Sequence, residues 1–152
     1  MPNMQMNKTP MPEQDPQARG KNFQEVALGY DAQMAKDEAE RCLNCKNKPC
    51  VAGCPVGVEI PGFIECVKKG DMNKAYEILR GCNSLPAICG RVCPQETQCE
   101  LKCVRGIKGE PVGIGRLERY VADWAMQNAL APQPHKEEKG EKVAVIGSGP
   151  AG

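Results

Sequence analysis

Apolar residues along most of this chain recur at the three- and four-residue spacing that predicts α-helices. In the stretch "AQMAKDEAERCL", which follows Asp31, the apolar residues Ala35, Ala39 and Leu43 share one side of a helix. Asp31 is a good N-cap, because its carboxylate accepts hydrogen bonds from the free N–H groups of a first turn. The charged residues fall largely on the other sides: Lys36, Glu40 and Arg41. We therefore expect a helix over residues 32–43 that brings Cys42 to its end.

Three more helices are expected from similar signals. Pro61 suits the first turn of a helix over "PGFIECVKKG", residues 61–70, which a glycine ends. Asp71 then caps a helix over residues 72–80, and Gly81 is expected to end it. A longer helix is expected over residues 113–130. Since almost no alternating strand pattern precedes residue 143, the body of the chain is predicted to be all-α.

The ends of the chain differ from this body. Residues 1–22 are rich in proline and polar residues and are expected to be disordered or extended, so that regular structure begins near Phe23. The helical body is expected to span residues 23–131, and a proline-rich, then charged, linker to span residues 132–142. Residues 143–152, "VAVIGSGPAG", predict a strand that runs into a phosphate-binding turn at Gly147, Gly149 and Gly152.

Composition narrows the class of protein. The net charge of +1 gives no overall field for nucleic acid or an anionic membrane, so neither is an expected partner. No apolar run is long enough to span a bilayer, and the N-terminus lacks the apolar core of a signal peptide. A cytoplasmic location follows as an expectation, and there thiols stay reduced. The ten cysteines therefore favour metal ligands over disulfides.

Eight of these cysteines form two blocks. The first block is C-x2-C-x4-C-x3-C-P, and the second is C-x3-C-P-x4-C-x3-C. The first is close to the bacterial ferredoxin pattern, in which three cysteines wrap one cluster and the cysteine before proline reaches another. Zinc knuckles usually show two separate hairpins with two ligands each, and only one C-x2-C pair is present here. The spacing therefore favours iron–sulfur clusters over zinc.

The ferredoxin pattern also predicts that each cluster takes ligands from both cysteine blocks. The first cluster would take Cys42, Cys45 and Cys50, completed by Cys103 from the second block. The second cluster would take Cys54, Cys93 and Cys99, and it still lacks one ligand. Cys66 and Cys82 stand apart from both blocks and are interpreted as small buried hydrophobic residues.

Two residues compete to be the eighth ligand. Cys89 is a thiol four residues before Cys93. Glu118 falls about 40° from Ile114 on the last helix, within its apolar stripe, where a carboxylate is costly unless it is paired or bound to metal. Arg116, Arg119 and Asp123 lie on the opposite side of that helix. The simpler alternative for Glu118 is a buried ion pair with Arg91 or Arg105.

The order of these motifs resembles a known family. "MPEQDP", the two cysteine blocks, "GEPVGIGRLERY" and "VAVIGSGPAG" are similar to the N-terminal part of the small subunit of NADPH-dependent glutamate synthase. The same module opens the large subunit of NADH-dependent ferredoxin:NADP oxidoreductase and also dihydropyrimidine dehydrogenase. The resemblance covers nearly all of residues 10–152, and the cysteine blocks are its specific part.

The resemblance implies an α-helical ferredoxin-like domain with two 4Fe–4S clusters. It assigns Cys42, Cys45, Cys50 and Cys103 to one cluster, and Cys54, Cys93 and Cys99 to the other. The family's non-cysteine ligand, Gln in one branch and Glu in another, falls on Glu118, whereas Cys89 matches a cysteine near the site that is not a ligand. Residues 143–152 match the start of a FAD-binding Rossmann domain, which is incomplete here, so this chain is not expected to bind FAD.

The function expected from the resemblance is electron transfer. The parent enzyme would take hydride from NADPH onto FAD and pass single electrons through the clusters to a larger subunit. No catalytic residue is expected in this chain, whose partners would be the flavin domain of the parent chain and that larger subunit. Two alternatives remain open: a structural zinc domain, and a helical domain that docks a partner subunit.

Overall fold

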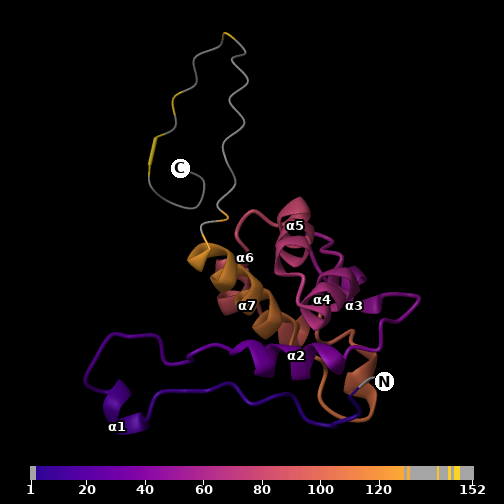
Figure 1. The fold of residues 1–152 in the computed structure, drawn as a ribbon, viewed down its shortest axis with the longest axis horizontal. Helices are drawn as coiled ribbons and strands as arrows, with labels where there is room; N and C mark the ends of the chain where they lie inside the picture. The colour runs from indigo at the N-terminus through magenta and orange to yellow at the C-terminus, as the bar shows by residue number, and fades with distance from the viewer. Residues whose placement is uncertain (1–2, 129, 131–139, 141–143, 145, 148–152) are drawn as a thin grey trace.

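The computed structural model describes residues 3–128, 130, 140, 144 and 146–147. Its helices are short and follow one another closely, as Figure 1 shows. They are α1 (Pro16–Arg19), α2 (Ala32–Glu40), α3 (Pro49–Ala52), α4 (Ile60–Lys69), α5 (Met72–Cys82), α6 (Pro86–Val92) and α7 (Ile114–Gln127). Two 3-10 turns, η1 (Gln95–Thr97) and η2 (Val104–Ile107), lie in the second cysteine block and directly after it.

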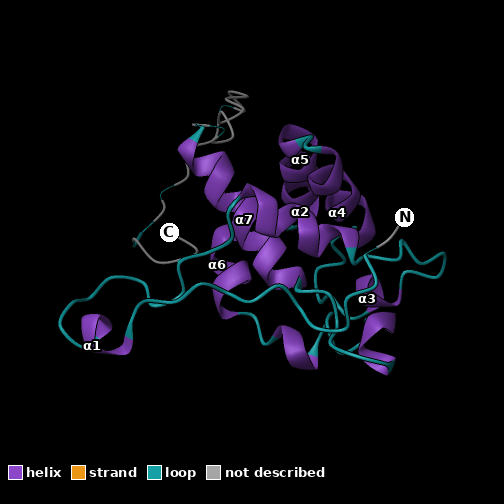
Figure 2. Cartoon of the chain, turned by 60° about the horizontal axis from the view of Figure 1, so that its bottom comes forward, coloured by secondary structure: helices purple, strands orange, loops and turns teal. Residues whose placement is uncertain are grey.

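The described part of the chain is helical and contains no strand, which confirms the predicted all-α class for these residues. Helices α4 and α5 form a hairpin, α2 packs on α4, and α7 packs on α5 and α6 (Figure 2). One isolated antiparallel bridge joins Glu13 to Ala27. No helix among the described residues has the length and apolar character needed to cross a membrane. The closer relation to helical ferredoxins stays a prediction.

The capping signals act as expected, whereas three helix ends were predicted wrongly: those of α2, α5 and α7, the last of which ends at Gln127 and not at residue 130. Asp31 accepts a hydrogen bond from the Met34 N–H, but the helix ends at Glu40, three residues before the expected end. Gly70 ends α4 in the left-handed conformation, at a φ of 78°. Helix α5 continues through Gly81 to Cys82, because Asn83 caps it instead with extended backbone. Cys82 is exposed, so its predicted burial was wrong, and Cys66 is half-buried.

The core lies where α2, α4, α5 and α7 meet. Its side chains are mostly aliphatic, and the largest fully buried apolar ones are Phe63, Ile64, Leu79, Leu117 and Val121. Four cysteines of the two blocks, Cys42, Cys50, Cys54 and Cys103, pack against this core, and Cys99 belongs to it. The cysteine loops are therefore packed against the helices and do not hang free in solvent.

The N-terminal segment is ordered along the helical body. Residues 3–11 run as extended chain, and the Asn3 N–H donates to the Glu40 carbonyl at 2.8 Å. The Glu110 N–H donates to the Met6 carbonyl, also at 2.8 Å. Of the two alternatives expected for residues 1–22, disordered or extended, the extended chain describes residues 3–11. The wider expectation that regular structure begins near Phe23 was wrong, because α1 precedes it and Phe23 itself lies in an exposed loop.

Residues 12–28 form an arm that projects from the body and carries α1 near its far end (Figure 1). A charge network attaches this arm to α6 and α7: Arg91 pairs with Glu25 at 2.5 Å and with Asp123 at 2.8 Å. Arg119 joins the same two carboxylates and is only 6% exposed. Arg119 does lie opposite the apolar stripe, but the arm and α6 cover it.

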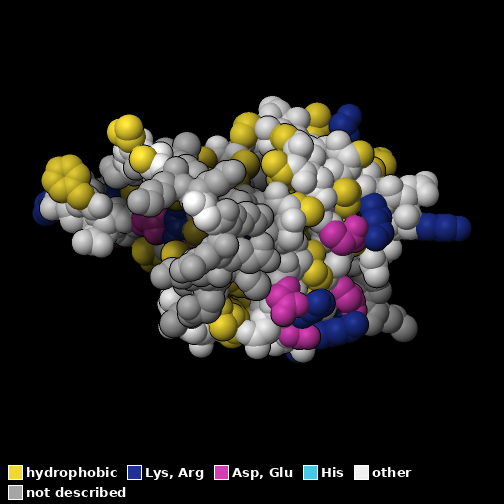
Figure 3. All heavy atoms as spheres, turned by 90° about the horizontal axis from the view of Figure 1, so that it is seen from above, with side chains coloured by type: hydrophobic (Ala, Val, Ile, Leu, Met, Phe, Trp, Pro, Cys, Tyr) yellow, Lys and Arg dark blue, Asp and Glu magenta, His cyan; other side chains and the backbone are white. Residues whose placement is uncertain are grey.

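Acidic and basic side chains also lie next to one another on the face seen in Figure 3. That mixing agrees with the small net charge of +1. The described side chains on this face form no large area of a single sign that would attract a polyanion.

The expectations for the C-terminal region fall largely outside the described residues. His135, most of the linker 132–142, and both Gly149 and Gly152 are not described. Residues 144, 146 and 147 are described and are not assigned to a strand. Gly147 has a φ of 115°, a conformation that glycine adopts readily. The strand and the phosphate-binding turn stay predictions.

Candidate metal centres

The cysteines of the two blocks line two separate cavities. The first cavity is called the first site below. Cysteines from both blocks border it, together with residues of η2 and with prolines in the first turns of α3 and α4. Its lining includes Cys42, Cys45, Cys50, Cys103, Pro49, Pro61, Val104 and Arg105. The structure thus brings Cys103 of the second block to the three cysteines of the first block with which the sequence grouped it.

The second cavity, called the second site, lies between the first cysteine block, the second block and α7. Its lining includes Cys54, Cys93, Cys99, Cys89, Glu118, Asn83, Gln95 and Gln98. Both candidates for the eighth ligand, Cys89 and Glu118, therefore face the same cavity as the three predicted cysteines. The structure shows this proximity, and the metal-binding roles remain to be tested.

Local backbone geometry explains how the first block curls. Asn44 and Lys48 have φ values of 48° and 42°, so the chain turns sharply on both sides of Cys45. Pro49 then starts the short helix α3, which carries Cys50. Gly53 follows, and a Cβ there would stand 2.7 Å from the Gln98 carbonyl oxygen. Only glycine fits without displacement, and this close backbone contact joins the two cysteine blocks.

The thiols of the first site are buried beside one another. Burial, followed by the neighbouring Cys42 and Cys103, raises the pKa of the Cys50 thiol to about 11. Burial also raises the pKa of Cys42, while the backbone N–H of Asn44 opposes that shift. At neutral pH the Cys42 and Cys50 thiols are thus protonated when no cation is bound. A bound metal would take thiolate ligands and release the protons.

The thiols of the second site share this character. Burial and the adjacent Cys89 raise the pKa of Cys93 to about 11. Burial and Glu100 raise the pKa of Cys99 to about 12. Cys54 also raises both pKa values, so thiols that line the same cavity affect one another here.

Glu118 is a half-buried carboxyl group with one neutral partner. Burial raises its pKa to about 7, and a hydrogen bond from Asn83, which donates from Nδ2 at 2.7 Å, opposes that shift. Among the described residues, Glu118 does not form the alternative ion pair with Arg91 or Arg105. Arg91 binds Glu25 and Asp123, and Arg105 donates to the Gln5 carbonyl and to the Met4 sulfur. Glu118 thus faces the cavity without a cation.

Both cavities have a donor set rich in thiols. Within the described ranges, no three His, Cys, Asp or Glu side chains converge as the ligands of one metal ion would. Thiolates bind zinc as well as iron–sulfur clusters, and it is the spacing of the cysteines along the sequence that favours clusters.

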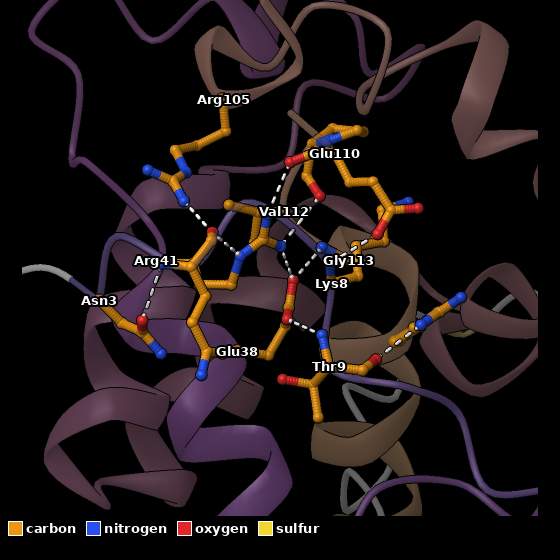
Figure 4. A network of polar contacts seen from close by, with 12 residues as sticks. Asn3, Lys8, Thr9, Glu38, Arg41, Arg105, Glu110, Val112 and Gly113 are labelled. Atoms are coloured by element: carbon orange, nitrogen blue, oxygen red, sulfur yellow. Dashed lines mark hydrogen bonds and ion pairs between the residues drawn. The ribbon is translucent and has the colours of Figure 1, made fainter. Parts of the chain in front are cut away.

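A second layer of polar contacts supports the first site (Figure 4). Arg41 and Glu38 are fully buried and paired at 2.6 Å. Arg41 also donates to four backbone carbonyls, those of Gln5, Met6, Glu110 and Pro111. Glu38 accepts from the N–H groups of Thr9 and Gly113. This pair fastens the N-terminal segment to the turn at residues 110–113.

That turn also contacts a predicted ligand. The Val112 N–H points at the Cys103 sulfur, 3.5 Å away. The helical pattern did not predict this layer of contacts, because it places Arg41 on the polar side of its helix. The only signals in the sequence were the i, i+3 spacing of Glu38 and Arg41 and the position of Arg41 directly before Cys42. The carbonyls that bury Arg41 come from segments far away along the chain.

Comparisons with known proteins agree with this geometry. A family model described as dihydropyrimidine dehydrogenase domain II, 4Fe-4S cluster, matches residues 19–130. The chain is 43% identical over 136 residues to the putative oxidoreductase UacF of Escherichia coli strain K12, covering 88% of this chain and 21% of that protein.

Two further relatives have more specific names. The chain is 41% identical to the glutamate synthase [NADPH] small chain of Halomonas elongata, over 93% of this chain and 30% of that protein. It is 39% identical to the NAD-dependent dihydropyrimidine dehydrogenase subunit PreT of Escherichia coli strain K12, over 84% and 31% respectively. The chain thus spans between a fifth and a third of the length of these relatives.

Proposed function

We propose that this chain, which belongs to the dihydropyrimidine dehydrogenase domain II, 4Fe-4S cluster family, carries two 4Fe–4S clusters and passes single electrons between them. Membership of the family makes it an iron–sulfur domain of oxidoreductases. The number of clusters, the ligands and the parent enzyme are the parts that go beyond membership. The observation that supports them best is the pair of cavities, each lined by cysteines from both blocks.

The ligands follow from which side chains share a cavity. In the first site, four cysteines would hold one cluster: Cys42, Cys45, Cys50 and Cys103. In the second site, three cysteines and a carboxylate would hold the other: Cys54, Cys93, Cys99 and Glu118, with Cys89 as the alternative eighth ligand. A carboxylate oxygen is a harder ligand than a thiolate, so the two clusters would differ in reduction potential.

When bound, such clusters supply one-electron redox chemistry, since iron cycles between two oxidation states. The chain's own residues bind and shield them. Burial of the thiols excludes water, and the Val112 N–H at the Cys103 sulfur is the kind of donor that tunes a cluster's potential. Two sites in one small domain offer a path for electrons across it. Neither site needs a substrate pocket for this role.

The parent that we propose is an NADPH- and FAD-dependent oxidoreductase of the glutamate synthase small-subunit type. The name of the Halomonas relative supports this choice, and the PreT name supports a pyrimidine-reducing parent instead. In either parent, FAD would bind in the domain that begins at residues 143–152, with Gly147, Gly149 and Gly152 in its phosphate-binding turn. The expected partners are that flavin domain and a larger electron-accepting subunit, in the cytoplasm.

The test is anaerobic reconstitution of the chain with iron and sulfide, followed by assays for iron, sulfide and zinc and by redox titration. We expect two reducible clusters per chain. Cys103→Ser and Cys54→Ser should each remove one cluster, from the first and the second site respectively. Cys82→Ser, at an exposed cysteine outside both cavities, is the matched control and should retain both. Tight zinc binding without sulfide or redox activity would support the structural zinc alternative.

A further inference from the structure

We propose that Asn83 determines which side chain completes the second site, because it holds Glu118 towards the cysteines and holds Cys89 back. This inference rests on the proposed function, in which Glu118 is a ligand. Asn83 caps the C-terminus of α5 and is 7% exposed. Its side chain contacts both α6 and α7, which carry the two candidate ligands.

The orientation of the Asn83 amide is fixed by its neighbours. Its Oδ1 accepts a hydrogen bond from the Leu85 N–H at 2.9 Å, at the start of α6. The same oxygen lies 3.6 Å from the Cys89 sulfur, within range of a weak bond from the thiol. A reversed amide would set its own NH2 group against the Leu85 N–H. The amide nitrogen must therefore face away from α6, towards α7.

That nitrogen holds one oxygen of Glu118. Asn83 Nδ2 donates to Glu118 Oε1 at 2.7 Å, and no further hydrogen bond or ion pair of Glu118 is found among the described residues. In this part of the chain no buried side-chain oxygen is left without a partner. The second carboxylate oxygen is therefore accessible from the cavity that Glu118 lines together with the cysteines. Asn83 thus leaves one oxygen free to bind metal there.

The same amide restrains the competing thiol. Cys89 lines the second site and lies beside Cys93, so it is close enough to compete for the cluster. Its contact with Asn83 Oδ1 turns the thiol towards the amide, and the Gln95 side chain holds the backbone of the same residue by donating to its carbonyl at 3.0 Å. Without the Asn83 amide, Glu118 would lose its anchor and Cys89 its acceptor. A thiolate ligand would then be favoured over a free carboxylate.

The experiment tests whether the removal of Asn83 changes which candidate ligand, Glu118 or Cys89, the second-site iron requires. The full chain is reconstituted anaerobically, and iron, sulfide and the midpoint potential of each cluster are measured. In the otherwise unchanged chain, Glu118→Ala should lose the second-site iron and Cys89→Ser should lose none. With Asn83→Ala, this pattern should reverse: Cys89→Ser should now remove the second-site iron, and Glu118→Ala should cause no further loss. The second-site potential should shift with Asn83→Ala while the first-site potential stays constant.

A second variant separates positioning from folding. Asn83→Asp keeps an acceptor for the Leu85 N–H, removes the donor to Glu118, and should lower second-site iron while the first site stays filled. Asn128→Ala is the matched control, because that asparagine is exposed at the end of α7 and donates only to the Trp124 carbonyl. It should change neither site.

Two results would overturn the role of Asn83: wild-type iron and potentials with Asn83→Asp, or an unchanged dependence on Glu118 with Asn83→Ala. A different result, full iron after Glu118→Ala in the unchanged chain, would contradict the ligand assignment itself.

Discussion

The first and second sites use similar cysteine loops but are completed in different ways. The first is lined by four cysteines and supported by Arg41 and Glu38, which are fully buried and fasten the N-terminal segment beside it. The second is also lined by four cysteines, Cys54, Cys89, Cys93 and Cys99, but a carboxyl group and neutral amides join them, and no lysine or arginine is among its described lining residues. In each site an element that is distant along the chain adds a contact. The turn at residues 110–113 contacts Cys103 of the first site, and α7 carries Glu118 to the second.

Removal of metal should have the largest effect and should act on both sites. Structural metal sites can supply on the order of 10 kcal/mol of folding free energy. We expect the apo chain to keep helical far-UV circular dichroism but to lose fixed packing around both cysteine loops, as seen in near-UV circular dichroism and NMR dispersion. An apo chain with fully dispersed spectra and an unchanged melting temperature would contradict a structural role for either site.

Arg41→Met should destabilise the first site more than the second. It leaves Glu38 as a buried charge without its partner, which typically costs about 3–5 kcal/mol. We expect a lower free energy of unfolding in denaturant titrations, and faster loss of first-site iron to a chelator. Arg19→Met is the control, since Arg19 is a surface arginine whose pairing with Glu13 spans 3.7 Å. The comparison of the sites fails if the second-site iron is lost first.

Substitutions of Glu118 should change only the second site. Glu118→Gln keeps an oxygen that can accept from Asn83 and bind iron, so both clusters should form and one potential should move. Glu118→Ala removes the oxygen ligand and should lose the second-site iron. Iron content and redox titration measure both effects. Full iron in Glu118→Ala, together with loss of a cluster in Cys89→Ala, would make Cys89 the ligand.

The smallest effects should come from two helix caps, one on a helix that leads to the first site and one on a helix that leads to the second. Asp31 caps α2, which leads to Cys42 of the first site, and Asp71 caps α5, which leads to Asn83 of the second. Each substitution to alanine should cost about 1 kcal/mol. Hydrogen exchange should show faster opening of α2 in one variant and of α5 in the other. Equal opening of both helices in either variant would show that the two sites do not respond separately.

The sequence predicted best what depends on local pattern. Asp31, Asp71 and Gly70 act at the helix ends where they were expected, and the periodicity placed Glu118 on a buried face. The cysteine spacing also grouped side chains that prove to share a cavity. These features depend on neighbours within a few residues, or on a spacing with a known geometric meaning.

The sequence could not predict what depends on distant backbone. Arg41 is buried because carbonyls of residues 5–6 and 110–111 surround it, and a helical pattern contains no trace of them. Arg119 is covered by the arm for a similar reason. Gly81 did not end α5. The cap of this helix is Asn83, two residues later, and its side chain also accepts from the Leu85 N–H at the start of α6. Partners of this kind become visible only once the fold is known.

Gly53 has a consequence for the rate of electron passage. It lies between Cys50 of the first site and Cys54 of the second, and a Cβ at this position would stand 2.7 Å from the Gln98 carbonyl oxygen and 3.0 Å from Cys99 Cα. The absence of a side chain thus lets the two cysteine blocks approach closely at this point. Because electron tunnelling weakens steeply with distance, even the methyl group of Gly53→Ala would separate the blocks and slow the transfer. The residue with no side chain acts as the spacer.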